Sequence, residues 1–590
     1  MCLCALPERL PAACYSRLIP LSTLRHCLPL LAAGTWSKGY QNDVVPLPNI
    51  RKLQAEGLEF HRHYSNVPVC CPSRASFWSG RHAHHIPHLH NGVDVGGAWN
   101  NYEGLPLNYT NRIDQVLERE GYAVQVAGKT DWDTGGHSVN VRLGAWTMYT
   151  DFPYNIPKAG GWHEETNDCA AEGSAGPGDT PWSPTGGGAT AHGGDWNTAN
   201  KTVQWIREQA AAPGNSPWFA FQGMDIVHPP YRTTSHWYEK IDPTKIELPP
   251  WAALDTLHPC DLQSSMLKGC TPSDNESAAF YNESRRLNVR RVYYSMIAEF
   301  DAMVGFYMDT VQASGQWNET VFIVTSDHGD MQMEHQQHYK MVPYDASASV
   351  PMVVYDGRPG KQVANGGYII DITTQLIDIF PTIMEFAQVP PPHWPAGLDG
   401  HSLVSLFTPP LTSPSSPSPS AVTTSADRPD FVVSQFHGDN IAMSWFLVVA
   451  TGVSDPAGTT PATFKLIVYG TGKEVPSMLF NLDADRSELK NLINDAAHAS
   501  VLQTMDAKLR TVIDYPTVAT AVAQYGLDMF KEWINATGPA WKSQVHEEGL
   551  RWDASWNYNA SGSIAAVEKW LTQPAVVKAC KHDLVFTPSN

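Results

Sequence analysis

Short apolar runs alternate with helix-spaced apolar positions through the first two thirds of the chain. Three runs are continuous enough for buried strands, and each ends at or next to a Gly, Asp or His. The stretches between them have apolar residues at helical spacing and stop at Gly. This alternation predicts an α/β fold with a large, mostly parallel sheet, whose strand ends should carry the chemistry. The predicted strands are 122–128, 217–227 and 320–327, and the predicted helices are 110–121 and 290–315.

The last third of the chain has a different pattern. Residues 409–428 are rich in Pro and Ser and read as a linker or surface loop. Short apolar runs at hairpin-like spacing follow, with a helical stretch at 498–513. We therefore expect a catalytic domain over 31–408, the linker 409–428, and a smaller antiparallel α+β subdomain over 429–590.

Charge and composition narrow the function. The chain of 590 residues has 40 basic and 59 acidic residues, a net charge of −19, which argues against a general nucleic-acid binder. No apolar run approaches the roughly 18–20 residues that span a bilayer. Several Asn-x-Ser/Thr triplets favour the secretory pathway. They begin at Asn108, Asn200, Asn275, Asn282, Asn318, Asn535 and Asn559.

Four polar segments stand out as candidate chemistry. Cys70 opens the run CCPSR, which Gly80 and Arg81 close. The other three segments follow predicted strands, and they place Lys129 in GKTDW, His228 in DIVHPPY, and Asp327, His328 and Lys340 in the segment that begins SDHGD.

These residue types suit a reaction at a tetrahedral anion. Asp327 and His328 offer an oxygen and a nitrogen to a divalent cation. Arg74, Lys129, His228 and Lys340 supply positive charge and donors that would stabilise attack on a phosphate or sulfate ester. Taken singly, each segment has a purely structural interpretation; in CCPSR, Ser73 could be a helix N-cap. Their joint occurrence in this order favours a catalytic site.

The run Cys-x-Pro-Ser-Arg followed by Gly-Arg resembles the signature of type I sulfatases. The resemblance implies an alkaline-phosphatase-like sulfatase fold and oxidation of Cys70 to formylglycine by the formylglycine-generating enzyme. A hydroxyl of the hydrated aldehyde would attack sulfur and expel the alcohol, and the second hydroxyl would then let the intermediate collapse and release sulfate. Cys71 occupies the variable position of the motif.

Further roles follow from the same resemblance. Calcium would be bound by Cys70, Asp327 and His328, and Arg74 would hold the aldehyde hydrate. The sulfate would be gripped by Lys129, His228 and Lys340. His137 and His437 are additional candidates for substrate contact. The implied substrate is a sulfated sugar, such as the uronate 2-O-sulfate of a glycosaminoglycan.

The N-terminus departs from the family pattern. Sulfatases open with a central strand that ends in calcium-binding Asp residues, and we find neither that strand nor a signal peptide within residues 1–30. We expect this segment to be a misassigned start or exon. Two alternatives to the sulfatase remain: a catalytically impaired protein that binds sulfated glycans, and a phosphodiesterase or phosphatase of the same superfamily.

Overall fold

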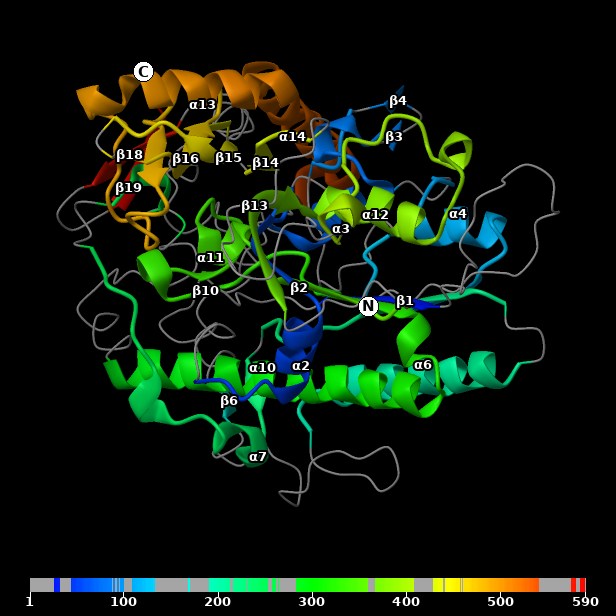
Figure 1. Ribbon diagram of the computed structural model, residues 1–590. Helices are drawn as coiled ribbons and strands as arrows, with labels where there is room; N and C mark the ends of the chain where they lie inside the picture. Colours follow the sequence, from blue (N-terminus) through cyan, green and yellow to red (C-terminus); the bar gives the residue numbers. More distant parts are fainter. Residues whose placement is uncertain are drawn as a thin grey trace.

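The structure is a computed structural model with helices on both faces of a central sheet (Figure 1). It describes residues 44–87, 109–132, 190–264, 283–407 and 428–540 with short internal gaps, together with residues 96–99 and 105 and the strands 26–31, 89–90, 93–94, 168–169, 575–579 and 584–588. Among the described residues, no helix is long and apolar enough to cross a membrane.

The central sheet has seven strands in the order β13-β2-β12-β9-β1-β7-β5. β12 runs antiparallel to its neighbours β2 and β9, and every other pair is parallel. The prediction of a mixed, mostly parallel sheet is confirmed. The strands are β1 (His26–Leu31), β2 (Leu58–Tyr64), β5 (Ala123–Gly128), β7 (Trp218–Gly223), β9 (Thr320–Thr325), β12 (Met352–Asp356) and β13 (Tyr368–Gln375).

The first strand corrects the sequence interpretation. β1 (His26–Leu31) lies in the middle of the sheet, parallel to β9 on one side and to β7 on the other. The expectation that this central strand is missing is therefore wrong. The strand is short and contains Pro29, a residue uncommon in central strands, which is why its pattern is weak. Its six residues, HCLPLL, include no carboxylate.

Helices cover both faces of the sheet and enclose two apolar cores. In Figure 1, α2, α6 and α10 lie below the sheet, and α3, α4 and α12 lie above it. α10 is longer than predicted because its apolar face continues toward the N-terminus. The helices are α2 (Pro48–Glu56), α3 (Cys70–Ser79), α4 (Ile113–Arg119), α6 (Gly193–Ala211), α7 (Ser235–Tyr238), α10 (Glu283–Ala313), α11 (Asp345–Ala348) and α12 (Ile379–Phe386).

The C-terminal part is an antiparallel sheet, β14-β15-β16-β17, against which α13 packs, as expected from the sequence. β14 contacts β13 and β2, so the two sheets adjoin. Nearly all of the predicted linker 409–428 lies outside the described residues, and the domain limits stay predictions. The elements are β14 (Phe431–Phe436), β15 (Trp445–Val453), β16 (Ala462–Tyr469), β17 (Met478–Asn481), α13 (Ala499–Val512) and α14 (Tyr515–Thr537).

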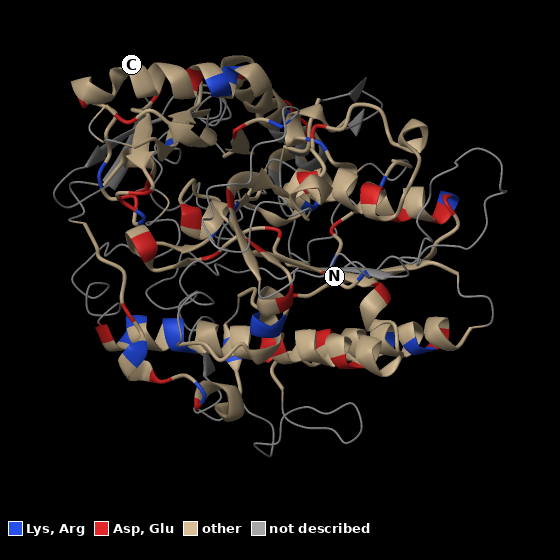
Figure 2. Ribbon diagram, viewed as in Figure 1, with Lys and Arg blue, Asp and Glu red and all other residues tan. Residues whose placement is uncertain are grey.

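Four two-stranded sheets accompany the two larger sheets in the described part of the chain. They pair β3 (Leu89–His90) with β4 (Val93–Asp94), β6 (Asp168–Cys169) with β8 (Arg232–Thr233), β10 (Met331–Gln332) with β11 (His338–Tyr339), and β18 (Ala575–Ala579) with β19 (Leu584–Pro588). Basic and acidic residues are interspersed over the helices and loops of the molecule (Figure 2). An anion-binding site would therefore be a local cluster of basic side chains.

Candidate active site

The cysteine pair opens α3. Cys70 is the first residue of this helix, Cys71 is the second, and both are fully buried. Ser73 is not the N-cap, since Val69 occupies that position; the interpretation of Ser73 as a cap is wrong. The Ser73 hydroxyl instead donates to the carbonyl oxygen of Asp327 at 2.5 Å, which ties the start of α3 to the end of β9.

Four predicted residues surround the sulfur of Cys70. The ammonium of Lys340 lies 2.8 Å from Sγ, Nε2 of His328 lies 3.4 Å away, and the ammonium of Lys129 lies 3.7 Å away. His228 lies close enough to the same thiol to interact with it electrostatically. Residues as far apart in sequence as 70 and 340 thus converge on one buried atom, where an oxidised Cys70 would place its reactive oxygens.

The parallel sheet delivers two of these side chains. Lys129 directly follows β5, and His228 lies in the turn after the neighbouring strand β7. Gly128 has φ +77°, and a Cβ there would come within 1.8 Å of the carbonyl oxygen of Gly223. Glycine therefore lets the two strand ends approach closely enough for both side chains to reach Cys70.

Lys340 is placed by a strained backbone. Its neighbours Tyr339 and Met341 have φ of 74° and 75°, in the left-handed region that non-glycine residues rarely adopt. The amide of Tyr339 donates to Asp330 Oδ1 at 3.1 Å, and the amide of Met341 donates to the carbonyl oxygen of Pro68 at 3.1 Å. Such strain persists only where surrounding contacts hold it.

Arg74 lies buried between two carboxylates. Its Nε is 2.9 Å from Oδ2 of Asp327 and 3.4 Å from Oδ2 of Asp131, and its Nη1 donates to the carbonyl oxygen of Lys129 at 2.7 Å. Burial would raise the pKa of Asp327, but Arg74 and then His328 outweigh it and lower that pKa below its usual range. For Asp131, burial dominates and raises the pKa despite Lys129 and Arg74. Arg74 thus keeps Asp327 ionised in the interior.

A divalent cation has a partial set of ligands here. Sγ of Cys70, a carboxylate oxygen of Asp327 and a ring nitrogen of His328 all lie within 4.8 Å of one another. Nδ1 of His328 faces the carbonyl oxygen of Gly329 at 2.8 Å, so a proton there leaves Nε2 free to donate its electron pair to a metal. Calcium usually takes about 6–8 oxygen ligands, so these residues fit one part of its shell.

His228 is held as a neutral hydrogen-bonding group. Its Nδ1 lies 2.6 Å from the carbonyl oxygen of Pro229, and its Nε2 lies 2.6 Å from the hydroxyl of Tyr339. Burial first, and then Lys340 and Lys129, lower the pKa of His228 to about 4. Sequence reasoning missed Tyr339, because nothing but its position beside Lys340 marks it.

The two additional candidates for substrate contact stand apart. His137 lies outside the described residues. His437 is buried and packs edge-on against Trp99 and Phe446, with ring centroids 5.0 and 5.7 Å away. Within the described part of the chain, neither of its ring nitrogens has a hydrogen-bond partner. His437 is therefore not one of the groups around Cys70, and its role in substrate contact stays a prediction.

The burial of His437 has a consequence for acid stability. Burial and then nearby His84 lower the pKa of His437 to about 3, from 6.5 in the unfolded chain. Between these values the unfolded state binds the extra proton, so stability is lost as the pH falls below 6.5. We expect His437→Phe to be more stable than the wild type at pH 5 by about 2 kcal/mol, with a smaller gain at pH 7.

Urea unfolding at the two pH values measures this difference. His393→Phe, at an exposed histidine, is the control for the substitution itself and should change the free energy of unfolding by less than about 1 kcal/mol at either pH. If His437→Phe and the wild type lose stability equally on acidification, the buried imidazole is not the acid-sensitive group.

Comparison with known proteins agrees with this geometry. The sulfatase family profile matches residues 32–389. The chain is 31% identical over 543 residues to arylsulfatase K of Danio rerio, covering 90% of each protein.

Solved structures share the fold at lower identity. Phosphonate monoester hydrolase of Agrobacterium radiobacter superposes with a TM-score of 0.57 at 20% identity, over 82% of this chain and 94% of that one. A structure in complex with its substrate D-glucosamine-2-N,6-O-disulfate superposes with a TM-score of 0.56 at 15% identity, over 82% of this chain and 96% of that one. The family match and the arylsulfatase K similarity both extend over most of the sequence, so the chain belongs to the sulfatase family and is a sulfuric ester hydrolase.

Proposed function

We propose that this sulfatase removes the 2-O-sulfate of a uronate residue in a glycosaminoglycan or similar polysaccharide, using formylglycine at position 70 and calcium. The observation that carries the proposal is the arrangement of Lys340, Lys129, His328 and His228 around the buried sulfur of Cys70. The similarity to arylsulfatase K supports the uronate part of the proposal.

The residues around position 70 divide the work. Formylglycine at this position would supply a hydrated aldehyde whose hydroxyl attacks sulfur. Lys340 and Lys129 would face the sulfate oxygens and stabilise the charge that develops on them. His228 would donate or accept a hydrogen bond there, and a bound anion would favour its protonated form. Calcium, held by Asp327, His328 and residue 70, would act as a Lewis acid on the same oxygens.

The proposed location is the secretory pathway, with a lysosomal or extracellular destination. Formylglycine requires the formylglycine-generating enzyme as a maturation partner. Two acceptor asparagines of the Asn-x-Ser/Thr triplets, Asn318 and Asn535, are exposed, as glycosylation needs.

Hydrolysis of matched sugars tests the substrate. Protein from the native source should release sulfate from a 2-O-sulfated uronate disaccharide at least about tenfold faster, by kcat/KM, than from a 6-O-sulfated glucosamine disaccharide. A peptide mass spectrum should find formylglycine at position 70. Equal rates on both disaccharides would contradict the uronate assignment, and an unmodified thiol would contradict the mechanism.

The second candidate is a phosphoester hydrolase of the same fold, favoured by the structural likeness to a phosphonate monoester hydrolase. Assays with paired aryl sulfate and aryl phosphate esters separate the two. We expect the sulfate ester to be hydrolysed faster. Binding of a sulfated polysaccharide without sulfate release would instead identify a glycan-binding protein.

A further inference from the structure

We infer that the C-terminal subdomain positions Lys340, with Trp445 and Lys465 as positioning residues that hold the strained segment 339–345 from outside the active site. The inference rests on the proposed role of Lys340 in gripping sulfate. It adds residues of the second sheet to the machinery of the reaction.

The segment needs external support. Tyr339 and Met341 both have positive φ, and neither is glycine, so the backbone on each side of Lys340 is in an unfavourable conformation. Lys340 itself is 1% exposed, and its ammonium lies 2.8 Å from Sγ of Cys70. A small relaxation of this backbone would move the ammonium away from position 70.

Trp445 of β15 supplies the first support. Its indole N–H donates to the carbonyl oxygen of Met341 at 3.1 Å, and its ring is buried beside Phe436. The hydrogen bond is formed at the residue directly after Lys340. Because Trp445 is fixed within the antiparallel sheet, it restrains the backbone at the point of strain.

Lys465 of β16 supplies the second support for this segment. Its fully buried ammonium donates to the carbonyl oxygen of Pro343 at 3.2 Å and to Glu488 Oε1 at 2.7 Å, and it also pairs with Asp345. Glu488 Oε2 accepts the amide proton of Asp345 at 2.7 Å. Three contacts from the C-terminal subdomain therefore fix residues 343–345.

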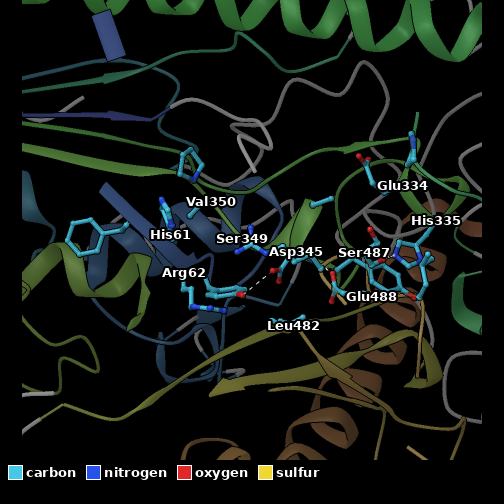
Figure 3. A pocket seen from close by; sticks show the side chains of 18 of the residues that line it. His61, Arg62, Glu334, His335, Asp345, Ser349, Val350, Leu482, Ser487 and Glu488 are labelled. Atoms are coloured by element: carbon cyan, nitrogen blue, oxygen red, sulfur yellow. Dashed lines mark hydrogen bonds between the residues drawn. The ribbon is translucent and has the colours of Figure 1, made fainter. Parts of the chain in front are cut away.

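A cavity lies at this junction between the two parts of the molecule. It has a volume of about 330 Å³ and is lined by residues of β2, of α11 and of the segment 482–489. Figure 3 shows Asp345 and Glu488 next to each other on its wall. The hydroxyl of Tyr64, in β2, donates to Asp345 Oδ2 at 3.2 Å. The contacts of Lys465, Glu488 and Asp345 thus form a polar cluster beside this cavity. The cluster holds the backbone at residues 343–345.

A double-mutant cycle tests whether these residues act through Lys340. Trp445→Phe keeps an aromatic ring, although a smaller one, and removes the indole N–H, so kcat/KM on an aryl sulfate should fall about three- to tenfold. In a Lys340→Ala background, Trp445→Phe should lower kcat/KM by less than about twofold, because the side chain that Trp445 positions is absent. Lys465→Met should behave in the same way with a larger loss.

Controls separate positioning from general destabilisation. Rates are divided by the formylglycine content of each preparation, measured by mass spectrometry. Lys508→Met removes the exposed ion pair to Asp430 in the same subdomain. It should leave kcat/KM unchanged both in the wild type and in the Lys340→Ala variant. Because Lys465→Met leaves the buried Glu488 and the half-buried Asp345 without their cation, it can fail to fold, and Trp445→Phe then decides the test.

The outcomes distinguish the role of Lys340 in the reaction from the role of Trp445 in positioning it. If Lys340→Ala retains full activity, the proposed role of Lys340 fails. If Lys340→Ala is impaired and Trp445→Phe multiplies its loss by the same factor as in the wild type, the role of Lys340 stands and the positioning inference is overturned.

Discussion

Replacing Cys70 by Ala is expected to lower sulfate-ester hydrolysis by roughly four orders of magnitude or more, because the residue proposed as the nucleophile is lost. The surrounding cations would remain in place, so the variant should still bind a sulfated ligand. Turnover of an aryl sulfate in the presence of calcium measures the loss, and equilibrium binding of a sulfated disaccharide measures what is retained.

Cys71→Ala is the matched control. Cys71 is equally buried and adjacent in the same helix, yet it is the variable residue of the motif. We expect its activity to stay within about fivefold of the wild type, with a stability cost of about 1 kcal/mol from the lost packing. If the two cysteine variants lose activity equally, the loss reports damage to α3, and the nucleophile remains unassigned.

Replacing Arg74 by Met is expected to reduce the free energy of unfolding by about 3–5 kcal/mol at pH 7, because two buried carboxylates lose their cation. Arg74 lowers the pKa of Asp327, so the stability it contributes is present at neutral pH and is lost as the pH falls through the folded-state pKa. The difference between variant and wild type should therefore shrink in acid. Because the loss begins below the ordinary carboxyl pKa of 3.8, urea unfolding at pH 7 and pH 3 measures it.

A second substitution checks the cause. Adding Asp131→Asn to Arg74→Met removes one of the two buried charges and should restore part of the lost stability. Arg510→Met, at a largely exposed ion pair with Asp506, is the surface control and should cost less than about 1 kcal/mol. A loss at Arg74 no larger than the loss at Arg510 would contradict the account of a buried, charge-compensating guanidinium.

The parallel sheet explains why so much of the site could be predicted from sequence. Strands of this kind end at the same edge, so a polar residue directly after each buried run is a candidate for that edge. Lys129, His228 and Asp327 satisfy this rule, and the structure brings all three to Cys70 or to its immediate neighbours. Their chemical roles stay predictions until the variants are measured.

Other features depend on tertiary contacts that no local pattern contains. β1 was missed because Pro29 interrupts a short apolar run, while its two neighbours in the sheet make the strand. Tyr339 and Met341 have positive φ although neither is glycine, so the sequence does not indicate this backbone conformation. The burial of His437 against Trp99 depends on packing between distant segments, which no local pattern of the sequence contains.

The burial of Cys70 also sets an order of events during synthesis. In the finished fold the thiol is fully buried and contacts Lys340, a residue that emerges from the ribosome 270 residues later. At about 5–20 residues per second, that delay is roughly 15–55 seconds. If Cys70 is oxidised as proposed, the oxidising enzyme would meet an accessible thiol only while the chain is still growing or unfolded, and slower translation beyond this point would lengthen the time available for that step.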